Sequence, residues 1–376
     1  MRILFTGGGS GGHFYPIIAV AQEFNNLIKE KRLVGAELFY MSPTPYNEGV
    51  LFENNITYKK NTAGKLRRYF SILNFFDLFK TGWGVIQSFI EVYKIYPDVV
   101  FAKGGYASFP VLLSAKILRI PVVIHESDSV PGRVNAWAGK FAKNIAISYP
   151  EAAKYFPAEK VAYTGNPVRK DVAIPITDGA KEFLKLDSDL PLIFILGGSQ
   201  GAKLINDTVL EGLASLVEKY QIIHQTGKNN FKEVVATADA VLYESKHKDR
   251  YKSFDYLNEL AMRMAAGEAK VIVSRAGSTI FEIASWAVPS ILLPITDSNG
   301  DHQRQNAFSY ARHGGCVVIE EKNLTFHILA SEIDRLMTHS DEASKMREAA
   351  KTFYKPEAAR TIAEEILKIA LTHEIQ

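Results

Sequence analysis

The chain has 376 residues, of which 47% are hydrophobic and 23% are charged, and its formal net charge is +3. This length suits two domains of roughly 150–200 residues, and the small net charge gives no reason to expect a nucleic-acid partner. The single cysteine, Cys316, cannot form an internal disulfide, which fits a reducing compartment. We find neither a signal peptide nor a run of about 18 apolar residues, so we expect no membrane-spanning helix.

Short apolar runs alternate with longer amphipathic stretches, and this alternation predicts the fold. Strands are expected at residues 2–6, 36–41, 98–102, 121–125, 144–148 and 161–164, then at 192–196, 221–225, 240–243, 270–274, 290–294 and 316–319. Helical patterns such as 16–29 and 202–220 follow most of these strands. The sequence therefore predicts an α/β protein with two doubly wound parallel sheets, that is, two Rossmann-like domains. We place them at 1–165 and 166–356, and the last helix, at 357–376, can pack on either domain, including back on the first.

Ligands of doubly wound sheets bind beyond the carboxyl ends of the strands. The turns expected there are 7–13, 103–108, 125–135, 197–202, 275–279 and 295–303. If the two domains face each other, these turns converge on one central cleft.

The first of these turns is glycine-rich and reads Gly7-Gly-Gly-Ser-Gly-Gly-His13. Its glycines allow the backbone to approach a ligand, and the helix start offers N–H groups to an anion. A dinucleotide site also needs an acid at the tip of the second strand, where the chain has none between Met41 and Thr44. A neutral His13 can accept a proton from a hydroxyl near pH 7. It can equally cap the helix or donate to a phosphate, and the residues alone leave both interpretations open.

Two further turns of the first half carry polar or glycine-rich motifs. The stretch Lys103-Gly-Gly-Tyr106 can hold a second phosphate on its amides, or it can simply be a tight turn. Glu126 lies at a strand tip, where a carboxylate is costly unless it has a partner. It can be a base, a partner for His13, a ligand for a sugar hydroxyl, or half of a structural ion pair.

The second half repeats the phosphate-turn pattern at 197–202, where Ser199 adds a hydroxyl donor. Small residues at 274–279 begin a helix whose positive end can stabilise a departing nucleotide diphosphate without a metal. Glu282 in that helix can accept two ribose hydroxyls, or it can be a surface carboxylate aligned with the helix dipole. Gln303 combines a donor and an acceptor, as recognition of sugar hydroxyls requires.

The pair Asp187 and Asp189 has the D-x-D spacing that some glycosyltransferases use to hold a metal. It precedes its strand and therefore lies at the wrong end of the sheet for the expected cleft. No His or Cys cluster has metal-ligand spacing either. We predict no metal and no other cofactor.

Taken in order, these motifs resemble those of the MurG family of bacterial cell-wall N-acetylglucosaminyltransferases. The matching stretches span nearly the whole chain and lie at 7–13, 104–106, 124–135, 165–169, 197–202, 274–277 and 302–307. The resemblance implies a GT-B fold, in which two Rossmann-like domains face a central cleft. It implies transfer of N-acetylglucosamine from UDP-GlcNAc, with inversion, to the C4 hydroxyl of undecaprenyl-diphospho-muramoyl-pentapeptide (lipid I), which gives lipid II.

The resemblance also implies roles for individual residues. His13 and Glu126 match the family's proposed catalytic residues. The acceptor diphosphate is expected on Gly8, Gly9, Gly104, Gly105 and Tyr106. UDP-GlcNAc is expected on Ser10, Gly11, Gly12, Asp128, Asn135, Arg169, Ser199, Gln200, Leu257, Ala276, Gly277, Ser278, Thr279, Glu282, His302 and Gln303. Asp128 departs from the family, because many relatives have an Asn there that contacts UDP-GlcNAc. A carboxylate cannot donate a hydrogen bond to the sugar nucleotide as an amide can.

Residues 65–83 combine aromatic and basic side chains at helical spacing. The membrane-facing candidates are Phe75, Phe76, Phe79, Trp83, Lys65, Arg67, Arg68 and Lys80. Basic residues beside exposed aromatics suit the surface of an anionic bilayer, whereas a buried core helix with a basic cap is the alternative. The resemblance implies peripheral association with the cytoplasmic face of the cell membrane, and partners in the cell-wall synthesis machinery.

Three other functions fit the same motifs. The first is a related GT-B transferase that uses another lipid acceptor, such as diacylglycerol. The second is a UDP-sugar epimerase with the same fold. The third is a non-catalytic module that only binds a nucleotide sugar, although His13, Glu126 and Glu282 are all present.

Overall fold

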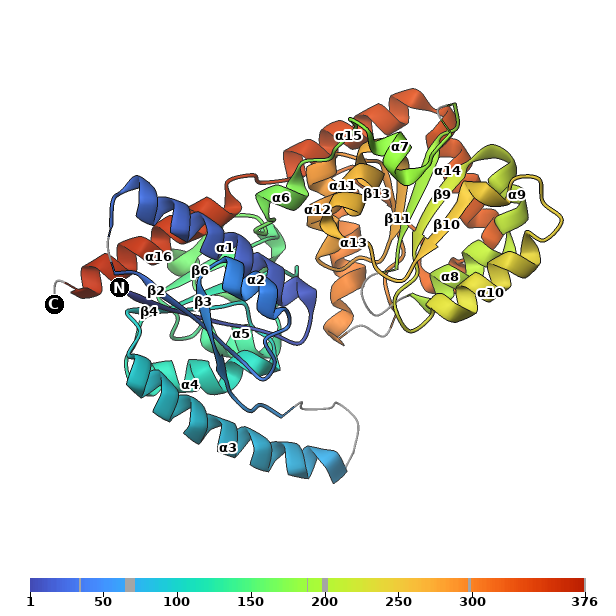
Figure 1. Cartoon of the computed structure of the whole chain (residues 1–376). Helices are drawn as coiled ribbons and strands as arrows, with labels where there is room; N and C mark the ends of the chain where they lie inside the picture. Colours follow the sequence, from blue (N-terminus) through green and yellow to red (C-terminus); the bar gives the residue numbers. More distant parts are fainter. Residues whose placement is uncertain (34, 65–71, 188, 198–201, 297–298, 375–376) are drawn as a thin grey trace. The chain divides into compact units, whose positions relative to one another are not determined.

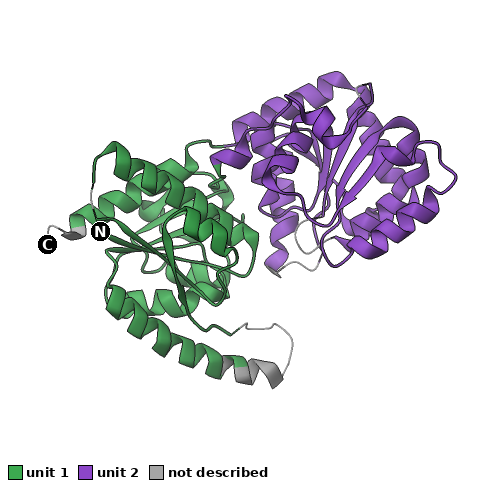
Figure 2. Ribbon diagram, viewed as in Figure 1, with its two compact units in different colours: residues 1–169, 355–376 green, residues 170–354 purple. Residues whose placement is uncertain are grey.

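The computed structural model describes residues 1–33, 35–64, 72–187, 189–197, 202–296 and 299–374. The chain divides into two compact units (Figure 2), of which unit 1 comprises Met1–Arg169 and Lys355–Gln376 and unit 2 comprises Lys170–Tyr354. The division falls four residues after the expected seam. The C-terminal segment belongs to unit 1, so this unit is built from both ends of the chain.

Unit 1 contains a parallel sheet of seven strands in the order β3-β2-β1-β4-β5-β6-β7. The strands are β1 (Arg2–Thr6), β2 (Glu37–Ser42), β3 (Ile56–Lys60), β4 (Val99–Ala102), β5 (Val122–Glu126), β6 (Asn144–Ile147) and β7 (Val161–Tyr163). Its α-helices are α1 (Gly11–Glu30), α2 (Glu48–Glu53), α3 (Ile72–Ile95), α4 (Phe109–Ile117), α5 (Arg133–Ala138) and α16 (Ala358–Glu374). Short 3₁₀ helices are η1 (Tyr106–Ser108), η2 (Pro150–Tyr155) and η3 (Ala158–Lys160).

Both faces of this sheet are covered, because successive strand residues point to opposite sides. Ile3 and Phe5 pack with α1 and α16 in one hydrophobic core, and Leu4 packs with α3, α4 and α5 in the other. Helix α16 lies along α1 (Figure 1), where Arg360 pairs with Glu30 at 2.7 Å. The last helix therefore completes the core of the first domain.

Unit 2 contains a parallel sheet of six strands in the order β10-β9-β8-β11-β12-β13. The strands are β8 (Leu192–Leu196), β9 (Gln221–Gln225), β10 (Tyr251–Phe254), β11 (Ala269–Ser274), β12 (Ser290–Leu292) and β13 (Cys316–Val318). Its α-helices are α6 (Lys170–Ala173), α7 (Ala180–Leu184), α8 (Lys203–Glu211), α9 (Leu213–Lys219), α10 (Phe231–Val241), α11 (Glu259–Glu268), α12 (Thr279–Trp286), α13 (His302–Arg312), α14 (Phe326–Thr338) and α15 (Ser340–Phe353). The 3₁₀ helices are η4 (Lys248–Arg250), η5 (Asn299–Asp301) and η6 (Glu321–Asn323).

The second sheet is also covered on both faces. One face packs against α8, α9, α10 and α14 in a single core. On the other face, Phe194 of β8 meets Trp286 of α12, with ring centroids 6.4 Å apart. The prediction of two doubly wound α/β domains is therefore confirmed.

Two strands and one helix differ from the sequence-based expectation. Residues 240–243 lie at the end of helix α10 instead of forming a strand, and β10 (Tyr251–Phe254) is the strand that follows β9 in the chain. The short run around Leu242 is apolar because that residue is buried at the end of a helix, and a run this short does not distinguish helix from strand. Strand β3 was missed, and the expected helix at 202–220 breaks into α8 and α9 at Gly212.

Candidate functional site

The strand orders place both pairs of glycine-rich turns at the points where the winding reverses. In unit 1 the chain runs from β1 outward to β3, and then returns to β4 on the other side of β1. In unit 2 the same reversal lies between β8 and β11. Such switch points open a crevice beyond the strand ends, where doubly wound proteins bind their ligands. The turns after β1 and β4, and those after β8 and β11, are therefore the candidate sites.

The N-terminus of α1 is built to leave its first amides available. Ser10 is the N-cap residue, yet its side chain makes no cap hydrogen bond to the helix backbone. Its Oγ instead lies 3.1 Å from His13 Nδ1. The first N–H groups of a helix have no partner within the helix, so Gly11 and Gly12 can present theirs to an anion.

The imidazole of His13 stands against the second glycine turn. A Cβ atom placed on Gly105 would lie 3.6 Å from His13 Nε2, so the ring approaches that backbone closely. When Nδ1–H donates to Ser10 Oγ, Nε2 keeps its lone pair and can accept a proton. Burial, and secondly the charge of Lys103, lower the pKa of His13 to about 4 while Asp128 acts in the opposite direction. The ring is therefore neutral at pH 7.

The second glycine turn requires glycine for two reasons. Gly104 has φ +85°, a backbone conformation that other residues rarely adopt. A Cβ on Gly104 would also lie 2.7 Å from both side-chain atoms Oδ1 and Nδ2 of Asn135. The structure thus brings 104–105, His13 and Asn135 together at one strand end.

Glu126 holds its own loop in place. Its carboxylate accepts hydrogen bonds from the backbone of Asp128 at 2.9 Å and of Gly132 at 3.0 Å, and from Asn135 Nδ2 at 2.9 Å. Burial, and secondly the charge of Asp128, raise the pKa of Glu126, whereas these donors and Lys103 oppose the rise. The three donors match a structural anchor better than a base that must approach a hydroxyl.

His125 connects strand β5 to the end of the first domain. Its Nε2 lies 3.0 Å from the Gly165 carbonyl and 3.2 Å from Ser148 Oγ. Burial lowers its pKa well below the usual value. Nε2–H therefore donates to Gly165 from a neutral ring, which makes His125 a structural residue.

Helix α12 in unit 2 also begins without a side-chain cap at Ser278, so its first amides are available to a diphosphate. Ala276 is buried, whereas Gly277, Ser278, Thr279 and Glu282 are partly exposed. Arg275, which precedes this turn, donates to the Leu293 carbonyl at 2.9 Å and pairs with Glu321 at 2.7 Å. The ion pair with Glu321 therefore connects the turn after β11 to the segment after β13.

Polar side chains bind the backbone of Ile295 and Thr296, which follow the strand β12 in unit 2. Glu321 accepts from Thr296 N at 2.9 Å, and Gln303 Oε1 accepts from Ile295 N at 3.2 Å. His302 begins α13 and is partly exposed beside Gln303. The Gln303 carbonyl oxygen therefore holds the loop, while its amide group carries the donors.

Leu257, the expected uracil contact, is buried, and its N–H donates to Gln225 Oε1 at 3.0 Å. A base that bound there would have to use the Leu257 carbonyl, because the N–H already has a partner. Gln225, at the end of β9, was not predicted from the sequence. Its position as the last residue of a buried strand is the signal that could have indicated it.

Arg169 is the last residue of unit 1. Its guanidinium lies over the ring of Tyr15 in α1, 4.1 Å from the ring centroid. This contact holds a cation on the first turns of α1. Two other residues that are expected to bind UDP-GlcNAc, Ser199 and Gln200, lie outside the described residues.

The helix that the spacing of residues 65–83 predicts is present from residue 72 onward as α3. Phe79 is 63% exposed and Trp83 is 64% exposed, and the exposed stripe continues through Ile86, Ile90 and Tyr93. Lys80 is exposed beside them. Lys65, Arg67 and Arg68 lie outside the described residues, as do the side chains of Phe75 and Phe76. For Phe79 and Trp83 the exposure contradicts the alternative of a buried core helix.

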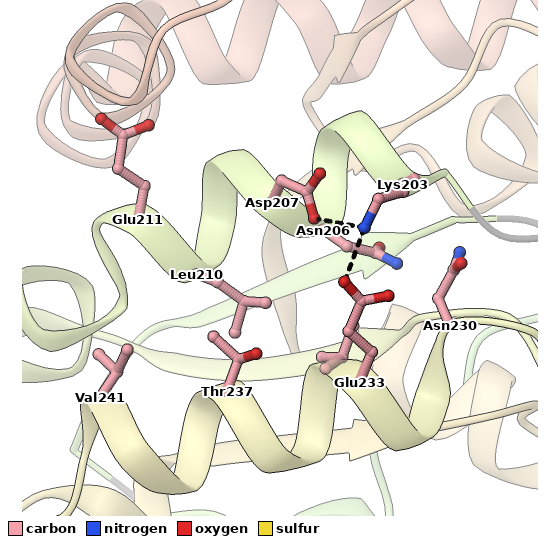
Figure 3. A pocket seen from close by; sticks show the side chains of 10 residues that line it. Lys203, Asn206, Asp207, Leu210, Glu211, Asn230, Glu233, Thr237 and Val241 are labelled. Atoms are coloured by element: carbon pink, nitrogen blue, oxygen red, sulfur yellow. Dashed lines mark hydrogen bonds and ion pairs between the residues drawn. The ribbon is translucent and has the colours of Figure 1, made fainter.

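A cavity of about 510 Å³ lies between α8 and α10 of unit 2 (Figure 3). Lys203 in its wall pairs with Glu233 at 2.8 Å and with Asp207 at 3.5 Å. Glu211 adds a third carboxylate, so the lining is net negative and disfavours an anionic nucleotide sugar. None of the predicted site residues lines it.

Within the part of the chain that the structure describes, no group of three or more His, Cys, Asp and Glu side chains could hold a metal ion. Asp187, of the D-x-D pair, accepts from the backbone of Asp189 at 3.0 Å. Among the described residues, no helix has both the length and the apolar content needed to cross a membrane.

Comparison with protein families agrees with this arrangement. Residues 3–147 match the glycosyltransferase family 28 N-terminal domain, and residues 192–364 match the glycosyltransferase family 28 C-terminal domain. The chain is 38% identical over 370 residues, which cover 97% of it and 99% of the relative, to the UDP-N-acetylglucosamine--N-acetylmuramyl-(pentapeptide) pyrophosphoryl-undecaprenol N-acetylglucosamine transferase 2 of Bacillus anthracis.

Solved structures share the fold. The crystal structure of Acinetobacter baumannii MurG matches with a TM-score of 0.71 and 24% identity, over 98% of this chain and 99% of that one. A UDP-GlcNAc 2-epimerase from Neisseria meningitidis, bound to UDP-GlcNAc, matches with a TM-score of 0.67 and 15% identity, over 98% of this chain and 100% of that one. At these identities the likeness concerns the fold alone, and it agrees with the predicted GT-B class.

Proposed function

We propose that this chain, which belongs to the MurG family of N-acetylglucosaminyltransferases, transfers N-acetylglucosamine from UDP-GlcNAc to undecaprenyl-diphospho-muramoyl-pentapeptide (lipid I). The product is lipid II, and the reaction inverts the configuration of the transferred sugar. The relative's name describes the same donor sugar and the same undecaprenol-linked acceptor. With 38% identity over nearly the full length of both chains, the family assignment carries this activity.

The observation that best supports a catalytic role is the placement of His13. This residue follows the glycines at the start of α1, a helix without a side-chain cap. It faces the turn at 104–105, and the contact between its Nδ1 and Ser10 Oγ orients the ring. A base next to phosphate-binding amides is the arrangement that a hydroxyl nucleophile on a diphosphate-linked sugar requires. A module that only binds a nucleotide sugar has no need of it.

In the proposed reaction, the acceptor diphosphate binds the turns at 8–9 and 104–106 of unit 1. His13 Nε2 takes the proton from the muramoyl C4 hydroxyl as the oxygen attacks the anomeric carbon. The bond from that carbon to the UDP oxygen breaks, and the amides at the start of α12 stabilise the negative charge on the leaving UDP. Glu126 shapes the loop at 126–135, and Glu282 binds the ribose.

We also propose that the enzyme associates peripherally with the cytoplasmic face of the cell membrane. A lipid-linked acceptor requires the enzyme to work at a bilayer surface. Exposed aromatic side chains on α3, with Lys80 beside them, provide a surface that can insert among lipid headgroups.

The function is tested by incubating the purified protein with UDP-GlcNAc labelled in the sugar, and with lipid I, diacylglycerol or no acceptor. We expect the label to move to lipid I alone. Transfer to diacylglycerol instead would identify a different lipid acceptor, and conversion of UDP-GlcNAc to its C2 epimer without any acceptor would identify an epimerase. The epimerase outcome has to be tested because the Neisseria meningitidis enzyme shares the fold.

A further inference from the structure

Lys103 occupies the switch point of unit 1. It is the first residue after β4, and its backbone N–H donates to the Thr6 carbonyl at the end of β1, at 2.9 Å. A Cβ placed on Gly7 would lie 3.0 Å from Lys103 Cβ. The lysine therefore joins the two glycine turns at the point where the sheet opens.

The side chain of Lys103 is buried at the end of β4. The residue is 1% exposed, and its Nζ has no hydrogen-bond partner among the residues that the structure describes. Burial lowers its pKa to about 8, whereas the charges of Glu126 and Asp128 raise it. Glu126 is already occupied by three N–H donors. A buried ammonium that lacks a hydrogen-bonding anion is costly, which suggests that an anion is its missing partner.

The two turns provide amides for that anion but little charge. Within 7–12 and 103–106, Lys103 is the one residue with a formal charge, and the adjacent His13 is neutral at pH 7. A diphosphate carries at least two negative charges, and a charged donor binds it more strongly than neutral amides do. The flexible four-carbon stem of lysine lets the ammonium reach toward the anion.

We propose that Lys103 is a binding residue for the acceptor, and that its ammonium receives a diphosphate oxygen of lipid I between the two glycine turns. This inference rests on the proposed function, because that function supplies an acceptor with a diphosphate. The diphosphate of UDP offers the same chemistry, and the experiment below separates the two sources.

The test compares Lys103→Met, which removes the charge at similar length, with Lys143→Met as a matched control. Lys143 is exposed and directly precedes β6, so it lies at the amino ends of the strands of the same sheet, whereas Lys103 lies at their carboxyl ends. In steady-state transfer assays we expect Lys103→Met to raise the KM for lipid I at least tenfold, or about 1.4 kcal/mol. We expect the KM for UDP-GlcNAc to change less than twofold, and the control to match wild type. A rise in the UDP-GlcNAc KM alone would overturn the acceptor assignment.

A binding measurement makes the inference independent of activity. Inorganic pyrophosphate is titrated calorimetrically into UDP-saturated protein at fixed ionic strength, and thermal unfolding verifies that each variant is folded. We expect wild type and Lys143→Met to bind it, and Lys103→Met to bind at least tenfold more weakly. Equal affinity in all three would overturn the inference. Lys103→Gln gives the same test if the Met variant does not fold. A wild type that binds pyrophosphate but transfers nothing to lipid I would refute the proposed function and not this anion site.

Discussion

At the scale of single residues, the site separates one reactive side chain from several that position it. His13 presents Nε2 to the second glycine turn and is oriented by Ser10. Glu126, His125 and Asn135 make hydrogen bonds that hold the loop and the strand ends. The sequence could identify all four as polar residues in the turns expected at 7–13 and 125–135, beyond the strand ends. It could not rank His13 above Glu126, because the donors that occupy Glu126 are mostly backbone N–H groups of a folded loop.

We predict that His13→Ala lowers kcat by roughly 10²-fold or more, since it removes the general base. Glu126→Gln should reduce kcat less than His13→Ala does, but should destabilise the protein by about 1–3 kcal/mol, since an amide cannot accept all three donors. Steady-state kinetics and thermal unfolding of both variants check this contrast. A change of only a fewfold in His13→Ala, with a far larger loss in Glu126→Gln, would reverse the two roles.

The environment of His13 gives a second residue-scale prediction. The charge of Lys103 contributes to lowering the His13 pKa to about 4, so Lys103→Met should raise that pKa. NMR titration of imidazole-labelled protein, with the resonance assigned through His13→Gln, measures it directly. An unchanged or lower pKa in Lys103→Met would mean that the two side chains do not interact as described.

At the scale of elements, the strands buried on both faces were the most predictable. β8 is a continuous apolar run, and β1 contains an apolar run at residues 3–5; a glycine follows each strand, and the structure gives both strands the expected bounds. β3 was missed because it is an edge strand with two lysines at its end. Residues 240–243, at the end of α10, are apolar like a short strand, but Leu242 packs in the core whereas Val241 and Tyr243 are exposed. Edge strands and helix ends carry weaker periodic signals, and their packing decides their state.

Helix α3 supports a prediction about the membrane. Replacing both Phe79 and Trp83 with Ser should reduce cosedimentation with anionic liposomes by several-fold, because two exposed aromatic anchors are lost. Phe52→Ser is the matched control, since Phe52 is 84% exposed on α2. Equal binding by wild type and the double variant would assign the exposed stripe to something other than lipid.

At the scale of the whole molecule, stability should depend on pH through buried neutral histidines. His224 in unit 2 is fully buried between Asn206 Oδ1 at 3.0 Å and the Tyr251 hydroxyl at 2.9 Å. Nε2–H donates to the first and Nδ1 accepts from the second, so the neutral ring is satisfied. Burial lowers the pKa of His224 from the ordinary histidine value of 6.5 to about 3. Between pH 6.5 and pH 3 the unfolded state binds more protons than the folded state does. The stability that the neutral His224 contributes is therefore fully present above pH 6.5 and is lost as the pH falls toward 3.

We therefore predict that wild type loses more unfolding free energy than His224→Gln when the pH drops from 7.5 to 5. The difference should be about 2 kcal/mol, at about 1.36 kcal/mol for each unit of pKa shift. Urea unfolding at both pH values measures it. His327→Gln, on the exposed surface, should behave as wild type does. The same pH dependence in wild type and His224→Gln would contradict this account of the buried ring.

We propose that the enzyme makes a new β-linkage to lipid I by a single displacement. NMR of the product formed from UDP-GlcNAc with ¹³C at the anomeric carbon tests it most directly. We expect the labelled carbon to appear in lipid II, β-linked to the muramoyl C4 oxygen, because the α-linked sugar of UDP-GlcNAc is inverted once. An α-linkage, a linkage to another position, or label that stays in the nucleotide sugar would exclude a single inverting transfer to lipid I.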